Sequence, residues 1–202
     1  MISKTSATWF LGLAVLWFMP GCTSATVLLV NVNSSSVAGV TGNLEFQFVP
    51  GVPAPLPATA TISNFQGGTI DGAPATFGPV TGSLSDSLTF TNSALGDYFQ
   101  PFTYGNSLSF MLVITGMSSP ALGASTFAFS MFNNSTPLVP LLTANLTDGF
   151  AFEVTDSKVT NFSAQTTIIE PVPEPASSGL IILGIMGLLR FFITAHKSQK
   201  LR

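Results

Sequence analysis

The stretch DYFQPFTYGNSLSFMLVITG, residues 97–116, decides the fold class of this chain. In its second half, large apolar side chains occupy every other position: Leu108, Phe110, Leu112 and Ile114. Successive side chains of a β-strand point to opposite faces, so this period of two predicts a strand with one face in a core. The stretch therefore favours a β-structure over a helix.

The same alternation recurs along the chain and is interrupted by turn-forming residues. It is clearest in LEFQF, residues 44–48, and the proline-rich segment 50–57 that follows cannot be a central strand. Apolar faces recur at 127–131 and 150–154, and further candidate strands are 27–32, 58–65, 84–90 and 159–162. Eight or more strands with frequent turns predict an all-β fold, a single antiparallel β-sandwich with a jelly-roll-like arrangement.

The charges of the chain exclude one class of function. Between residues 26 and 170, Lys158 is the only basic residue against eight acidic ones, which gives 1 − 8 = −7. Phosphate backbones are bound by clustered Lys and Arg side chains. We therefore expect no nucleic-acid partner.

The N-terminal segment has the layout of a signal peptide. Lys4 precedes an apolar stretch at 9–19, and small residues lead to Ala25, after which signal peptidase would cleave. Cys22 leaves one alternative open, a lipoprotein signal in which its thiol is acylated. If Cys22 is removed with the peptide, the exported chain has no cysteine and no disulfide.

The C-terminal segment predicts a membrane span. An apolar block at 176–195 reaches the roughly 20 residues that a transmembrane helix needs, if Arg190 is counted within it. The basic tail at 196–202 would remain in the cytoplasm and place the body of the chain outside. The basic residues that would stop transfer are Arg190, Lys197, Lys200 and Arg202.

A short motif precedes this block. Val172, Pro173, Glu174, Pro175 and Ala176, then an apolar helix and a basic tail, resemble the PEP-CTERM sorting signal of Gram-negative bacteria. The resemblance implies that an integral-membrane exosortase recognises and processes this end after export. One departure is that the basic residues are spread out, whereas members of the family usually end in a tight arginine cluster. The segments 42–51, 82–92, 97–116, 125–132 and 148–154 also resemble a group of uncharacterised β-rich PEP-CTERM proteins.

Few residues of the body offer chemistry. The one histidine, His196, lies in the C-terminal tail, so the body has no Ser-His-Asp arrangement and no imidazole ligand for zinc. Asp97 and Asp148 could act as acids in a hydrolase, although such aspartates more often form turns. The aromatic cluster Tyr98, Phe99, Phe102 and Tyr104 could hold a saccharide by stacking, or could belong to the core. We expect no enzyme, no cofactor and no metal.

These observations predict five segments: a signal peptide at 1–25, a β-sandwich at 26–166, a proline-rich linker with the sorting motif at 167–175, a transmembrane helix at 176–195 and a cytoplasmic tail at 196–202. The expected function is that of an exported, exosortase-sorted protein of the bacterial cell surface or extracellular matrix, anchored at its C-terminus before processing. Its role would be structural or adhesive, in association with exopolysaccharide. The alternative is a carbohydrate-binding module, and a hydrolase comes third. Expected partners are exosortase, signal peptidase, the membrane and exopolysaccharide.

Overall fold

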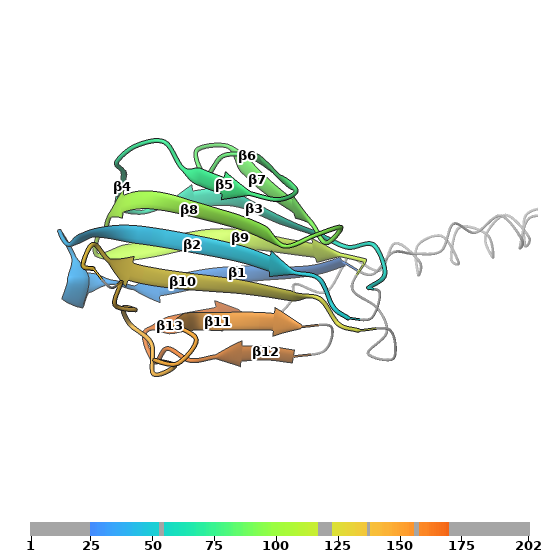
Figure 1. Cartoon of the computed structure of the whole chain (residues 1–202). Helices are drawn as coiled ribbons and strands as arrows, with labels where there is room; N and C mark the ends of the chain where they lie inside the picture. The colour runs from blue at the N-terminus through green and yellow to red at the C-terminus, as the bar shows by residue number, and fades with distance from the viewer. Residues whose placement is uncertain (1–24, 53–54, 117–122, 137, 156–157, 170–202) are drawn as a thin grey trace, which may run out of the picture. The chain divides into compact units, whose positions relative to one another are not determined.

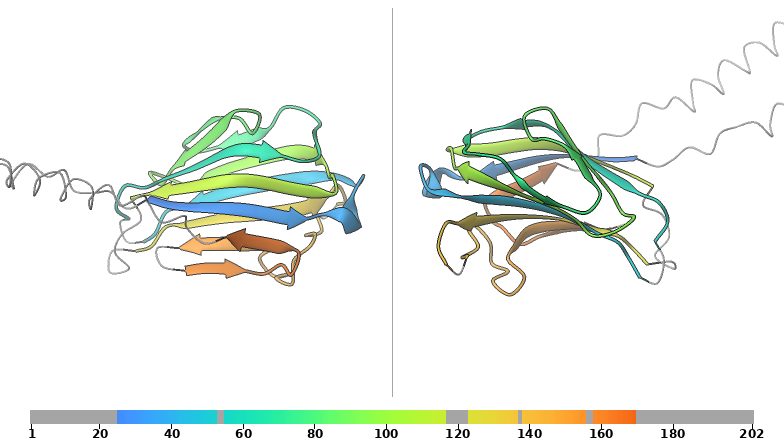
Figure 2. Two further views of the ribbon diagram at one scale, coloured as in Figure 1. Left: turned by 180° about the vertical axis from the view of Figure 1, so that it is seen from behind. Right: turned by 45° about the horizontal axis from the view of Figure 1, so that its top comes forward.

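A computed structural model describes residues 25–52, 55–116, 123–136, 138–155 and 158–169, and they form two antiparallel β-sheets packed face to face (Figure 1). The 6-stranded sheet, sheet A, has the order β13-β1-β9-β3-β7-β6. The 7-stranded sheet, sheet B, has the order β12-β11-β10-β2-β8-β4, and β5 also pairs with β8. Figure 1 has sheet B in front, and the reverse view in Figure 2 brings β1 and β9 of sheet A forward.

The two sheets are built from strands that are distant in the chain. Sheet A contains β1 (Ala25–Asn33), β3 (Thr59–Gln66), β6 (Val80–Gly82), β7 (Ser87–Thr91), β9 (Ser107–Thr115) and β13 (Thr166–Ile169). Sheet B contains β2 (Thr41–Val49), β4 (Thr69–Ile70), β5 (Ala75–Phe77), β8 (Gly96–Thr103), β10 (Thr126–Asn133), β11 (Phe150–Thr155) and β12 (Lys158–Asn161). Connections such as β1 to β2, β2 to β3 and β7 to β8 cross from one sheet to the other. The prediction of an all-β, antiparallel sandwich is confirmed.

The described residues contain one short 3-10 helix, Ser35–Val37. Within them, no helix is long and apolar enough to cross a membrane. The predicted membrane span at 176–195 lies outside the described residues, as does the signal peptide up to residue 24. Ala25, the predicted cleavage position, is the first residue of β1.

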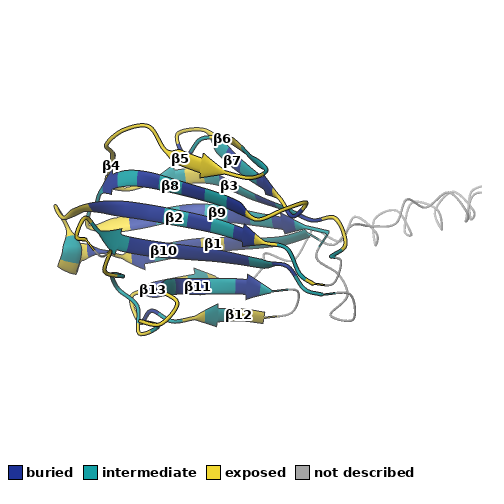
Figure 3. Ribbon diagram, viewed as in Figure 1, coloured by how far each residue is buried: buried dark blue, intermediate teal, exposed yellow. Residues whose placement is uncertain are grey.

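The core lies between the sheets and is rich in phenylalanine. On β9, the four alternating residues of the opening stretch are all buried, as predicted. Phe110 from sheet A meets rings of sheet B, with centroids 5.5 Å from Phe46 and 5.4 Å from Phe129, both edge to face. Phe152 packs 5.5 Å from Phe129. Edge-to-face and tilted contacts of this kind add to the stabilisation that burial of each ring supplies, and dark blue residues mark this layer in Figure 3.

The alternating segments predicted as strands coincide with β1, β2, β3, β9, β10, β11 and β12. The candidate at 84–90 is a strand only from residue 87 onward. Five elements were not predicted: β8, β13, and the short strands β4, β5 and β6 in the connection between β3 and β7. β13 extends to Ile169, so the segment predicted as a linker from residue 167 begins inside this strand.

Charge separates the two sheets. None of the described strands of sheet A contains an acidic or basic residue. The described strands of sheet B carry Glu45 on β2, Asp97 on β8, Glu153 on β11 and Lys158 on β12. The outer faces of the sandwich therefore differ chemically, one being neutral and the other acidic.

Candidate functional site

The aromatic cluster that could stack on a saccharide belongs mainly to the core. Tyr98, Phe102 and Tyr104 are 1%, 0% and 1% exposed, because they alternate on the inner face of β8 and just beyond it. Their rings are closed to a ligand, which corrects the expectation of a binding platform for these three residues. Phe99 points to the outer face of sheet B, is half-buried, and lies 6.4 Å from the ring of Phe132.

The hydroxyl of Tyr104 has a structural task. It lies 2.7 Å from the carbonyl oxygen of Asn43 and 2.9 Å from that of Phe132, and it accepts a 3.1 Å hydrogen bond from the backbone N–H of Phe132. Burial raises the pKa of Tyr104, so the hydroxyl stays protonated. Gly42 makes the approach possible, because a Cβ there would lie 2.9 Å from the Tyr104 ring. Tyr104 thus ties β2 to β10 from within the core.

The two candidate acids have different surroundings. Asp148 lies in an exposed turn, where its backbone N–H donates to Asn145 Oδ1 at 3.2 Å and its carboxylate accepts from Asn145 Nδ2 at 3.3 Å. This is the turn chemistry expected of an aspartate before glycine. Asp97 is a strand residue on the outer face of β8, so the turn interpretation is wrong for this residue.

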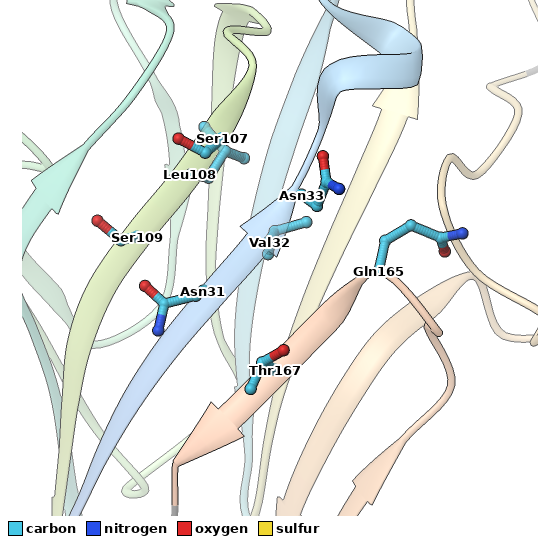
Figure 4. A pocket seen from close by; sticks show the side chains of 8 residues that line it. All are labelled: Asn31, Val32, Asn33, Ser107, Leu108, Ser109, Gln165 and Thr167. Atoms are coloured by element: carbon cyan, nitrogen blue, oxygen red, sulfur yellow. The ribbon is translucent and has the colours of Figure 1, made fainter.

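A shallow groove crosses one end of the neutral face of sheet A. Asn31 and Asn33 on β1 pair in register with Ser109 and Ser107 on β9, and Thr167 on β13 lies opposite Asn31. These side chains line the groove together with Gln165, over the buried Val32 and Leu108 (Figure 4). A second depression, formed partly by Thr59, Thr91 and Thr115, lies near the other end of β9.

The polar groups of the groove are available for binding. Among the described residues, the side chains of Asn31, Ser107, Ser109 and Thr167 have no hydrogen-bond partner. Asn33 is more constrained, since its Oδ1 accepts from the N–H and the hydroxyl of Ser35 at 3.2 and 2.7 Å. Amide and hydroxyl groups both donate and accept hydrogen bonds without carrying charge. The groove can therefore bind a neutral, hydroxyl-rich ligand, and it offers no strong acid, base or nucleophile.

Sequence reasoning did not single out the groove. The polar alternation Asn31-x-Asn33 and Ser107-x-Ser109 was visible, but only the pairing of β1 with β9 brings these pairs together. It also passed over Glu45, which lies on the outer face of β2. Burial is the main cause that raises the pKa of Glu45 to about 7, and the nearby charge of Asp97 raises it further.

The described residues contain no group of three or more His, Cys, Asp or Glu side chains that could hold a metal ion. The predicted sorting residues and basic stop lie outside the described part of the chain, from Val172 to Ala176 and from Arg190 to Arg202. Comparisons with protein-family models, with curated proteins and with solved structures find no match to this chain.

Proposed function

We propose that this chain is an exported, exosortase-sorted protein of the bacterial cell surface or extracellular matrix, with a structural or adhesive role in association with exopolysaccharide. The sandwich, which we class as jelly-roll-like because successive strands cross repeatedly between its sheets, is the exported body. The N-terminal signal peptide and the C-terminal span direct it across the inner membrane. The sorting motif at 172–176 and the basic residues after it support the exosortase step.

The neutral groove on sheet A is the observation that carries the adhesive role. A polysaccharide presents many hydroxyl groups, and each can exchange hydrogen bonds with amide and hydroxyl side chains such as Asn31, Ser109 and Thr167. The face around the groove carries no charged strand residue, so an uncharged polymer meets no unpaired charge there. The net negative body would repel a polyanion.

Sorting is tested by mass spectrometry of the mature protein isolated from its host. We expect a C-terminally shortened form that has left the membrane, and we expect Glu174→Ala to accumulate the longer, membrane-bound form. Glu170→Ala, a change just before the motif, is the matched control and should be processed normally. An intact terminus at Arg202 on all mature protein would contradict processing.

Adhesion is tested by electrophoresis in gels that contain neutral or acidic polysaccharides. We expect retardation by a neutral polysaccharide, and loss of this retardation in the double variant Asn31→Ala, Ser109→Ala. Ser87→Ala changes the outer face of the same sheet on β7, away from the groove, and should bind normally. Absence of retardation by every polysaccharide would contradict the adhesive role.

A carbohydrate-binding module is the second candidate, and the same groove favours it. The two roles differ in selectivity. A module would bind one saccharide with defined stoichiometry in isothermal titration calorimetry, whereas a matrix protein would bind several neutral polymers weakly.

A further inference from the structure

A pair of carboxyl groups lies on the acidic outer face of sheet B without a basic partner. On that face, Glu45 of β2 stands opposite Ser130 of β10 on one side and opposite Phe99 of β8 on the other. Asp97 precedes Phe99 by two residues, so it projects from the same face and lies diagonally from Glu45. It is near enough for its charge to act on Glu45.

Two buried oxygen atoms of this group lack hydrogen-bond partners among the described residues: Oδ1 of Asp97 and Oγ of Ser130. Ser130 is 1% exposed, and its hydroxyl lowers the pKa of Glu45, although the two groups do not meet in full hydrogen-bond geometry. Glu45 itself accepts one hydrogen bond, 3.0 Å from Gln47 Nε2. A buried carboxylate oxygen without a partner, such as Asp97 Oδ1, is uncommon and calls for a missing donor.

No described basic group can supply that donor. Lys158 is the only basic residue in the described part of the chain, and it lies on β12, with β11 and β10 between it and β2. The other titratable groups of the neighbouring elements are also acidic: Asp71 after β4, which accepts from Thr103 Oγ1 at 2.6 Å, Glu153 on β11, and Asp148 in the turn before β11, whose charge raises the pKa of Glu153. The outward positions of β10 and of β5 carry no titratable side chain.

We propose that Glu45 and Asp97 share one proton between their carboxyl groups, and that this shared proton makes the β2–β8 pairing sensitive to pH near neutrality. A carboxylic acid on one residue would donate its O–H to the ionised carboxylate of the other and give Asp97 Oδ1 its missing partner. The pair would then lose its two protons in two separate steps, and the pKa of each step would describe the pair and not a single residue.

Loss of the shared proton leaves two negative charges on neighbouring strands in a half-buried setting. The Phe99 and Phe132 rings, 6.4 Å apart, lie on the same face as the two carboxyl groups. Burial raises the pKa of Asp97 as well as that of Glu45, as expected for carboxyl groups in such surroundings. β8 links β2 to the short strands β4 and β5, so repulsion across β2–β8 would loosen this edge of sheet B first.

The direct test is a carboxyl NMR titration of the full-length protein labelled with 13C at the glutamate side chains. Sequence positions 45, 153, 170 and 174 hold its four glutamates, and Glu45→Gln identifies the signal of Glu45. We expect Glu45 to titrate with a midpoint near 7, and we expect Asp97→Asn to move this midpoint back toward the ordinary range. Glu153→Gln, which removes a neighbouring acid outside the pair, should leave the midpoint in place.

Hydrogen exchange supplies a second readout. Amide exchange in β8, corrected for its intrinsic pH dependence, should accelerate at least several-fold between pH 6 and pH 8 in the wild-type protein but not in Glu45→Gln. A Glu45 midpoint in the ordinary carboxyl range would overturn the proposal. So would a midpoint that Asp97→Asn leaves unchanged, because a water molecule would then satisfy Asp97.

Discussion

Replacing Tyr104 by phenylalanine tests whether this residue serves the core or a surface. The change keeps the buried ring but removes a hydroxyl that contacts two backbone carbonyls and accepts from the Phe132 N–H. An unsatisfied buried polar group costs about 1–3 kcal/mol, and this hydroxyl serves more than one. We therefore expect the free energy of unfolding to fall by about 2–3 kcal/mol, while retardation by neutral polysaccharides stays normal once the protein is folded.

Urea titration followed by circular dichroism measures this loss. The slope against denaturant should stay constant while the midpoint falls, because the native fold is retained. In a thermal scan, the same loss lowers Tm by roughly 4–12 °C for a domain of this size. Tyr98→Phe is the matched control, since its hydroxyl donates to Gln100 Oε1 at 2.9 Å and interacts with the backbone of Leu84 but does not join two strands, and its loss should cost about 1 kcal/mol. A loss for Tyr104→Phe below about 0.5 kcal/mol would refute the structural role of the hydroxyl.

Three further changes probe other parts of the sandwich. The pKa of Glu45 is about 7 in the folded protein, above the ordinary range for glutamate, so its stabilising contribution is complete below the unfolded pKa and is lost as pH rises through 7. Glu45→Gln should remove this pH dependence and raise the free energy of unfolding at pH 8 by about 1–2 kcal/mol after allowance for solvent screening. Chemical denaturation at several pH values measures this, and an unchanged pH profile would count against a raised pKa. Phe110→Ala empties the centre of the ring cluster and should cost about 3–5 kcal/mol, whereas Val113→Ala on the outer face of β9 should cost less than about 1 kcal/mol; equal losses would contradict the assignment of faces. Asn92→Ala removes an acceptor for the Ala58 N–H and a donor to Leu56 O and Ser125 Oγ, so the free energy of unfolding should fall by about 2–3 kcal/mol, as measured by thermal unfolding. Asn31→Ala in the groove is the control and should be nearly neutral.

The long strands could be predicted because their side chains alternate over a complete strand length. Leu44, Phe46 and Phe48 of β2 and the four inward residues of β9 show a period of two that turn residues do not interrupt. Short strands give no such signal. β4 and β5 cover Thr69–Ile70 and Ala75–Phe77, and all their residues are exposed, so no apolar face marks them.

β8 was missed for a different reason, since its sequence GDYFQPFT contains a proline, which argues against a central strand. The structure accommodates Pro101 at a gap in the pairing. On the side away from β2, β5 pairs with residues 97–99 and β4 with residues 102–103, so neither strand reaches Gln100 or Pro101. The buried amide of Gln100 fills this gap by donating from Nε2 to the carbonyl of Gly72 at 2.8 Å. The carbonyl of Pro101 accepts from the backbone N–H of Asp71 at 3.1 Å, and neither neighbouring strand on this side requires the N–H that proline lacks, so proline is tolerated here.

Which residues become neighbours on an outer face depends on the register between strands, and sequence alternation alone does not specify this register. Glu45 and Gln47 alternate with core residues, so the sequence indicates that they face outward, but it does not indicate that Asp97 stands opposite Gln47. Moving β8 by one residue along β2 would turn Asp97 toward the core and Tyr98 toward solvent. That shift is opposed by the burial of Tyr98 and Phe102 in the core and by the contacts of the Tyr104 hydroxyl with the carbonyls of Asn43 on β2 and Phe132 on β10. The core residues of β8 therefore place Glu45 and Asp97 diagonally on the outer face of sheet B. The aromatic cluster that suggested a saccharide platform instead fixes the position of this acidic pair.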